Sequence, residues 1–213
     1  MLNLLFILIL SYLAGSIPTA IMASKLVLKD DIRNHGSKNA GATNVFRVMG
    51  WKPALVVVLI DIGKGVAAVL LVTTLGPTPL SPMLVKILAG LAAIIGHIFT
   101  VFAGFKGGKG VGTAFGVLLS LAPAASLIAF GVWLALVFLT KMVSVGSLAA
   151  GVAFPLTLFV QRQFFGPGPE TELLYFGLVL GALIIVTHRA NIKRLLRGEE
   201  HRFGSGKKEA PST

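Results

Sequence analysis

The sequence contains no cysteine. This absence excludes disulfides, cysteine-ligated metals and a thiol nucleophile, and it leaves the redox compartment open. Charge is also scarce, because charged residues make up 13% of the 213 residues and Asp and Glu together number only 8. Hydrophobic residues reach 55% and the mean hydropathy is +0.87, values far from those of ordinary soluble domains. The composition predicts one membrane-embedded domain, which we assign to residues 1–200.

The formal net charge of +11 comes from basic residues that flank the apolar segments. In a soluble protein such a charge would suggest nucleic acid. Here it indicates orientation in a bilayer and binding of anionic ligands, and we expect no nucleic-acid partner.

Apolar segments occupy residues 2–24, 53–75, 84–103, 113–139, 142–160 and 172–188. All but the fourth are close to the ~20 residues that cross a bilayer. The first lacks the basic start and the short apolar core of a cleavable signal, so we expect a transmembrane helix there. The fourth is longer and contains Pro123, which breaks or kinks a helix, so we expect two short or bent pieces.

Basic residues decide the topology. They concentrate in 25–52, in 106–109 and in 189–208. Seven segments, but not six, place all three groups in the cytoplasm, as the positive-inside rule requires. We therefore predict an all-α polytopic membrane protein with seven transmembrane segments, the N-terminus outside and the C-terminus cytoplasmic. Residues 166–172 form an outer turn, and 201–213 form a disordered cytoplasmic tail.

Three polar segments are expected on the cytoplasmic side. They are the first polar segment, HGSKNAGATNVFR at 35–47, the glycine–lysine strip, GFKGGKGVGT at 104–113, and the last polar segment, THRANIKRLLRGEE at 187–200. Ser144 reaches the same side. A plain loop would explain the first, and topology or lipid headgroups would explain the basic residues Lys193, Arg194 and Arg197 of the last.

The glycine–lysine strip is harder to explain in that way, because topology needs lysine but not repeated glycine. Glycine lets backbone amides approach an oxyanion, and lysine adds charge, so we interpret the strip as a phosphate or carboxylate site. It is not a Walker A loop, because Gly110 follows Lys109 where serine or threonine is needed.

Two charges lie inside an apolar segment. Asp61 and Lys64 are three residues apart on one expected helix, so they should pair or face an aqueous cavity. His97 precedes the strip and is typical of a packing histidine, whereas His188 lies at the water boundary.

The cytoplasmic groups are rich in donors and poor in carboxylates. The donors are Ser37, Asn39, Thr43, Asn44, Arg47, Lys106, Lys109, Ser144, His188 and Asn191. Such a set suits phosphates and a transition state stabilised by fixed donors. The four histidines are scattered without close carboxylates, so we expect no metal.

The sequence resembles the bacterial acyl-phosphate:glycerol-3-phosphate acyltransferases from about residue 3 to about residue 200. The resemblance is carried by GSxNxGATN at 36–44, GHxFxVFxxFKGGKGVxT at 96–113 and HRxNIxRLxxGxE at 188–200, with GSIP at 15–18 and the Asp61–Lys64 helix. Thr100 departs from the pattern, since the family has proline there.

This resemblance implies that a fatty acyl group passes from acyl phosphate to the 1-hydroxyl of sn-glycerol 3-phosphate, giving lysophosphatidic acid and inorganic phosphate. It implies no cofactor, because the mixed anhydride is already activated. It also implies a bacterial cytoplasmic membrane, an active site facing the cytoplasm, and a soluble acyl-phosphate synthase as a plausible partner.

We assign the site residues to three groups on this basis. Catalytic roles go to Ser37, Lys109, His188 and Asn191; substrate binding goes to Asn39, Gly41, Thr43, Asn44, Arg47, Lys106, Gly107, Gly108 and Ser144; and Asp61, Lys64 and His97 support the site. Gly107, Gly108 and Lys109 are expected to hold the acyl-phosphate head. The proton acceptor is either His188 or a substrate phosphate, and we favour the phosphate.

Two other functional classes share features with this sequence. Broken spans and an intramembrane ion pair are features of transporters, so an organic-anion transporter or channel is the alternative. Its weakness is that the polar motifs gather on one face. The HxxxxD acyltransferases are excluded, because the fifth residues after the four histidines are Ala40, Phe102, Lys193 and Gly206.

Overall fold

The computed structural model describes residues 2–165 and 168–202, and the regular structure in these ranges is helical without a strand, which confirms the all-α prediction. Most of the expected tail 201–213 and part of the expected outer turn 166–172 lie outside the described residues. The α-helices are α1 Leu2–Ser16, α2 Thr19–Val27, α3 Ala42–Met49, α4 Trp51–Leu70, α5 Pro82–Ile98, α6 Val111–Leu121, α7 Pro123–Thr140, α8 Val143–Phe164, α9 Thr171–Thr187 and α10 Arg189–Leu196. Short 3-10 turns η1 Ile32–Asn34, η2 Val72–Thr74 and η3 Val101–Ala103 lie between them.

Five segments are long and apolar enough to cross a membrane: Leu2–Val27, Trp51–Thr74, Pro82–Ala103, Pro123–Thr140 and Val143–Phe164. A sixth arises if α9 and α10, bent by 61°, count as one span, and α6 is shorter. The break at Pro123 falls where the sequence predicts it, since α6 ends at Leu121 and α7 begins at Pro123. The total of seven crossings and the direction of the termini stay predictions.

The sequence predicts a single transmembrane helix at residues 2–24, but the structure has two helices there. The segment breaks at Ile17–Pro18 into α1 and α2. The cause is Pro18, which lacks an amide hydrogen and disfavours helical geometry at the residue before it. The break leaves the carbonyl of Ile17 and the hydroxyl of Thr19 free to bond other helices.

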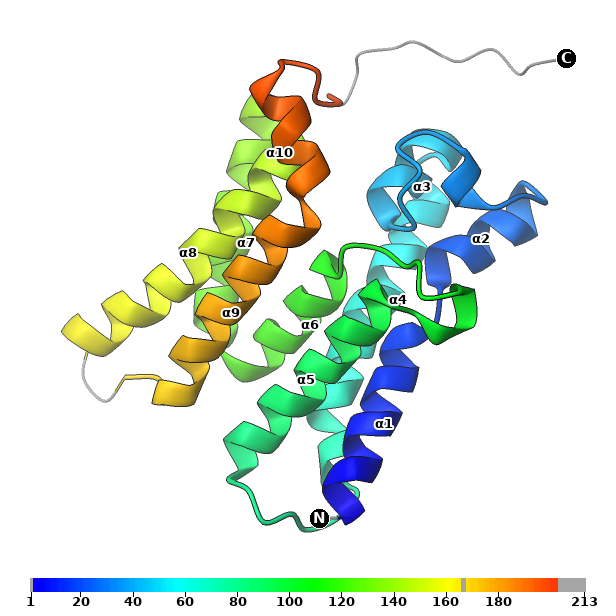
Figure 1. Cartoon of the computed structure of the whole chain (residues 1–213). Helices are drawn as coiled ribbons and strands as arrows, with labels where there is room; N and C mark the ends of the chain where they lie inside the picture. Colours follow the sequence, from blue (N-terminus) through cyan, green and yellow to red (C-terminus); the bar gives the residue numbers. More distant parts are fainter. Residues whose placement is uncertain (1, 166–167, 203–213) are drawn as a thin grey trace, which may run out of the picture.

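The three polar segments meet at one end of the molecule, which we call the polar end. Figure 1 shows α2, α3, α10 and the loop between α5 and α6 there, with the N-terminus at the opposite end. The first polar segment is not a plain loop, because its second half forms α3. Gly41 is the residue before this helix, and the helix buries Val45 in the core.

Small residues let α4 and α6 approach closely. A methyl group on Gly65 would collide with the carbonyl of Thr113, and one on Gly116 would collide with the carbonyl of Ile62. Close approach through small residues is how membrane helices gain packing when apolar lipid offers no hydrophobic drive. The contact positions α6, and with it the end of the strip, against the charged middle of α4.

Gly65→Ala should therefore weaken the fold, whereas Gly63→Ala on the same helix should not, because nothing lies within 4 Å of the site of its new methyl. Overpacking of this kind costs about 1–3 kcal/mol. Thermal unfolding of both variants in the same detergent measures the difference. Equal stability of the two variants would contradict this packing.

Candidate active site

A buried ion pair lies beneath the polar end. Asp61 and Lys64 are only 4% and 6% exposed, and Lys64 Nζ lies 2.8 Å from Asp61 Oδ1. The Lys64 ammonium also donates to the Ile17 carbonyl at 2.9 Å, and the Thr19 hydroxyl donates to Asp61. His97 Nδ1 lies 3.5 Å from Lys64 Nζ. The two charges thus pair with each other, one of the two arrangements expected from the sequence.

The same network reaches α6. The Thr113 hydroxyl is fully buried and lies 3.2 Å from His97 Nδ1. Thr113 is the last residue of the strip and lies in the first turn of α6, four residues after Lys109, so the network links the α1–α2 break, α4 and α5 to α6. The structure thus brings Asp61, Lys64 and His97 together beneath the strip, and their supporting role stays a prediction.

The strip folds back on the end of α5. The amide of Gly107 donates to the carbonyl of Ile98 at 3.0 Å, and the amide of Gly108 donates to the carbonyl of His97 at 3.1 Å. A methyl at Gly107 would collide with the His97 carbonyl, and one at Gly108 would collide with the His97 ring and the Ala40 carbonyl. This differs from our expectation that both amides face an anion, because close packing already uses them.

Other donors remain at the end of the strip. Gly110 precedes α6 with a left-handed φ of 79° and has no side chain with which to cap the helix. The first amides of an α-helix lack partners within the helix. Beside Lys109, these amides are the backbone groups suited to an anion, aided by the helix dipole.

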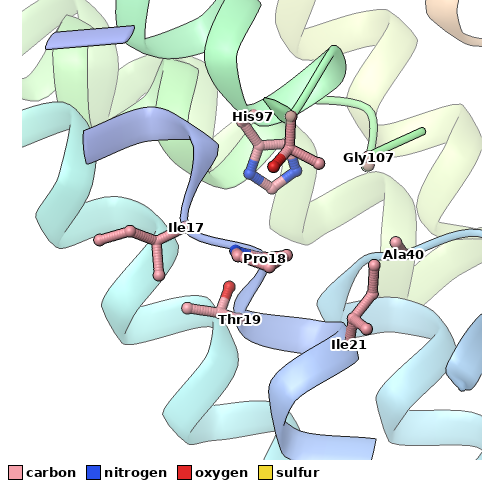
Figure 2. Close-up of a pocket in the computed structure, with 9 residues that line it drawn as sticks. Ile17, Pro18, Thr19, Ile21, Ala40, His97 and Gly107 are labelled. Atoms are coloured by element: carbon pink, nitrogen blue, oxygen red, sulfur yellow. The ribbon is translucent and has the colours of Figure 1, made fainter. Parts of the chain in front are cut away.

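The cavity in Figure 2 is too small for a substrate. It lies between the α1–α2 break, His97 and the Gly107–Gly108 peptide, and its volume of about 10 Å³ is near that of a single water. Ala40 lines the same cavity, so the first polar segment also contacts the strip there.

Lys109 connects the strip to the last polar segment. Its ammonium donates to Asn191 Oδ1, and Asn191 Nδ2 donates to Glu200 Oε1 at 2.8 Å. Glu200, only 8% exposed, pairs with Arg194 at 3.0 Å. Burial alone would raise the pKa of Glu200, but hydrogen bonds from Asn191 and Arg194 hold it below its ordinary value. The carboxylate is therefore charged and anchors the cations around it.

Lys109 has the most perturbed charge of this cluster. Burial lowers its pKa from 10.5 to about 8, and Glu200 opposes that shift. The charges of Arg194 and Arg47 lower the pKa further. An ammonium that has lost water and faces other cations is ready to bind an anion.

Arg47 and Ser144 belong to the same region. Burial lowers the pKa of Arg47, whose guanidinium also interacts with the charges of Glu200 and Arg194. The Ser144 hydroxyl is close enough to Glu200 to lower the pKa of that carboxyl, yet it makes no hydrogen bond of ordinary geometry among residues 2–165 and 168–202. A buried hydroxyl in this state is available to a ligand.

His188 is buried at the junction of α9 and α10. Its Nδ1 lies 2.9 Å from the carbonyl of Ile184, and this acceptor requires a proton on Nδ1. In the neutral ring, Nε2 is then the acceptor. The charge of Lys109 acts on the ring, which places His188 near the cluster.

The first polar segment contributes one locked side chain and three available ones. Asn44 accepts from the amide of Ser37 at 2.9 Å and donates to the carbonyls of Ile32 and His35, so it fixes the loop. The side chains of Ser37, Asn39 and Thr43 make no hydrogen bond within the described part of the chain. Lys106, by contrast, is exposed, and its carbonyl accepts from Arg33.

Four residues of the site were missed or underrated in the sequence. Glu200 is buried and pairs with the half-buried Arg194, Thr113 joins the network at His97, and Arg33 binds the strip. Glu200 and Arg194 did carry a signal, because both are fixed letters of the third motif. Arg194 was expected to serve topology and lipid headgroups, but it pairs with Glu200.

The comparisons with known proteins agree with this architecture. A family model described as glycerol-3-phosphate acyltransferase matches residues 5–198. The chain is 45% identical to the glycerol-3-phosphate acyltransferase of Pelodictyon phaeoclathratiforme, over 98% of this chain and 100% of that protein. It is 46% identical to the same protein of Chlorobaculum tepidum, again over 98% and 100%.

Solved structures match as well. The crystal structure of PlsY (YgiH), an integral membrane glycerol 3-phosphate acyltransferase, in its glycerol 3-phosphate form has a TM-score of 0.84 and 41% identity, over 95% of this chain and 96% of that one. Its lysophosphatidic acid form has a TM-score of 0.81 and 40% identity with the same coverage. The apolar helices and these matches identify an integral membrane protein. The chain belongs to the glycerol-3-phosphate acyltransferase family.

The low pKa of Lys109 can be measured directly. Competitive labelling with acetic anhydride and mass spectrometry should give a midpoint near pH 8 for Lys109. Glu200→Gln should lower that midpoint, because the Glu200 charge raises the pKa of Lys109, and Arg194→Gln should raise it. A midpoint near the ordinary lysine value of 10.5, or a shift of the opposite sign, would contradict this electrostatic arrangement.

Proposed function

We propose that this protein transfers a fatty acyl group from acyl phosphate to the 1-hydroxyl of sn-glycerol 3-phosphate. The products are lysophosphatidic acid and inorganic phosphate, and the step starts phospholipid synthesis. The observation that carries the proposal is the cluster of Lys109, Asn191, Arg194 and Glu200, with Arg47 in electrostatic reach, at the polar end of a membrane protein of this family. Two phosphate-bearing substrates match this excess of cations and amide donors.

The roles divide between the two phosphates. Lys109, with the first amides of α6 and the hydroxyls of Ser37 and Thr43, binds the acyl-phosphate head and stabilises the leaving phosphate. Gly107 and Gly108 shape the strip for this purpose. Arg47, Lys106, Ser144, His188 and Asn191 bind glycerol 3-phosphate. Asn39 orients the acyl carbonyl, Gly41 begins α3, and Asn44 fixes the loop.

A substrate phosphate accepts the hydroxyl proton in this proposal. Phosphate is a good leaving group from a mixed anhydride, so attack by the hydroxyl needs little help from a strong base. Glu200 is an unsuitable base, since both its oxygens already accept hydrogen bonds from Asn191 and Arg194. His188 keeps Nε2 as an acceptor and is the competing candidate.

The membrane arrangement is part of the proposal. One domain, residues 1–200, lies in the bacterial cytoplasmic membrane with seven segments, the N-terminus outside and the polar end facing the cytoplasm. The excess of basic residues near the polar end supports this direction. A soluble acyl-phosphate synthase would then deliver the donor from the cytoplasm.

Phosphate release tests the reaction. Purified protein in lipid nanodiscs should release phosphate from palmitoyl phosphate only when glycerol 3-phosphate is present, and palmitoyl-CoA should not replace the donor. Lys109→Ala should lower kcat by about 10²–10³-fold, as loss of a transition-state donor does. Lys193→Ala, which removes an exposed lysine of α10, serves as the matched control.

No turnover with either donor, from protein shown to be folded, would refute the reaction. Anion uptake in liposomes would then test the transporter alternative. Turnover with palmitoyl-CoA alone would keep an acyltransferase but refute the acyl-phosphate donor.

His188→Gln separates the two proton acceptors. If a substrate phosphate accepts the proton, the variant should raise KM for glycerol 3-phosphate and lower kcat less than about tenfold. A general base contributes about 10²–10⁴-fold, so a fall of kcat in that range at unchanged KM would identify His188 as the base. His188→Asn, which lacks an atom at the Nε2 position, is the matched control for binding.

A further inference from the structure

We infer that Arg33 is a positioning residue for this reaction: it fixes the turn that begins the glycine–lysine strip and so sets the approach of Lys106 and Lys109 to the substrates. Its Nη1 atom donates to the carbonyl of Ala103 at 3.0 Å and to the carbonyl of Lys106 at 3.1 Å. Arg33 thus joins the segment before the first motif to the strip, over a separation of about 70 residues. The inference rests on the proposed function.

The turn that Arg33 binds is one that its own sequence disfavours. Gly104 and Phe105 both adopt left-handed backbone geometry, with φ of 65° and 59°. Glycine accepts this readily, but a bulky residue does so only when its surroundings enforce it. The two carbonyls that Arg33 binds belong to the residues on either side of this pair, so its guanidinium closes the turn from outside. The amide of Phe105 closes the turn from inside by donating to the backbone carbonyl of Thr100 at 2.8 Å.

Asp31 holds the guanidinium in place. Its carboxylate accepts from Arg33 Nε at 3.0 and 3.1 Å and from Nη2 at 2.7 Å, which leaves Nη1 directed at the strip. The hydrogen bond with Arg33 lowers the pKa of Asp31, so the pair is charged at neutral pH. A lysine cannot reproduce this planar fork, because its ammonium is a single point of charge.

The backbone next to Arg33 is itself held in place at Ile32. Ser24 accepts from the amide of Ile32, and Asn44 donates to the Ile32 carbonyl at 3.1 Å. Arg33 therefore acts from the same framework that holds Ser37. The strip is held at its start by Arg33 and in its middle by α5, and Lys109 follows directly after the second anchor.

The test compares Arg33→Gln and Arg33→Lys with Arg197→Gln, an exposed arginine after α10 that serves as control. In the phosphate-release assay, both Arg33 variants should lose about tenfold to a hundredfold in kcat/KM, the order expected when reacting groups move by about 1 Å. Hydrogen exchange should rise within residues 100–109, while the melting temperature stays close to that of the wild type. Arg197→Gln should behave as wild type.

A double-mutant cycle isolates the role of the turn. Asparagine tolerates left-handed geometry, so Phe105→Asn removes the conformational cost that Arg33 offsets. In the Phe105→Asn background, Arg33→Gln should lose only about threefold relative to Phe105→Asn alone. A loss as large as in the wild-type background would refute the role in holding the turn.

The remaining outcomes separate this inference from the reaction itself. An active wild type with an equally active Arg33→Gln refutes the inference and leaves the reaction standing. Full activity of Arg33→Lys refutes the planar fork, and a fall in melting temperature with exchange raised throughout the protein refutes positioning. An inactive wild type refutes the reaction, but hydrogen exchange at 100–109 still tests whether Arg33 holds the turn.

Discussion

The buried pair of Asp61 and Lys64 is the interaction on which the polar end depends. Two charges deep in an apolar helix are tolerated only when each finds partners, and these partners come from the α1–α2 break and from α5. The α1–α2 break supplies the Ile17 carbonyl and the Thr19 hydroxyl, and α5 supplies His97. If any of these elements moved away, a charge or a polar group would be left without its partner in an apolar environment. The pair therefore fixes the relative positions of α1, α4 and α5, and through His97 also that of α6.

The site is built outward from this pair toward water. The His97 carbonyl accepts a hydrogen bond from the amide of Gly108. The His97 ring occupies the space that a side chain at position 108 would need. The next residue, Lys109, leaves the strip to reach Asn191 on α10, which in turn contacts Glu200. The charged Glu200 carboxylate keeps the cations beside it together, and in the proposed reaction a substrate phosphate would add the negative charge that the cluster still lacks. Rigid support beneath and mutual repulsion above are what a preorganised anion site requires.

Sequence patterns predict much of the fold and part of the candidate site. The remaining features depend on contacts between residues far apart in the chain. The helical fold, the interruption at Pro123 and the pairing of Asp61 with Lys64 follow from hydropathy, proline chemistry and helical spacing. The positive-inside rule correctly gathered the three polar segments at one end. It could not show that the Gly107 and Gly108 amides are used by α5, because an amide's partner depends on tertiary approach. The sequence does not predict the break at Ile17–Pro18, because Pro18 lies within a continuous apolar segment. It does not predict α3 either, because the glycines around 36–41 are typical of a loop. In the sequence Arg33 is one of several basic residues of 25–52, and its carbonyl partners lie about 70 residues away, so no local pattern distinguishes it.

The shortness of α6 has a consequence for the proposed site. α6 has 11 residues and α7 has 18, and the two share the turn at Ala122. At 1.5 Å per residue they measure about 16 Å and about 27 Å, so α7 is about 10 Å longer than α6. In the proposed membrane arrangement, the amides at the start of α6 would therefore lie deeper than the end of α7, toward the level where the acyl chains of the bilayer begin. In the proposed reaction, a lipid-borne donor at that level would react without leaving its leaflet, and the single-chain product would stay in the membrane while phosphate is released to water.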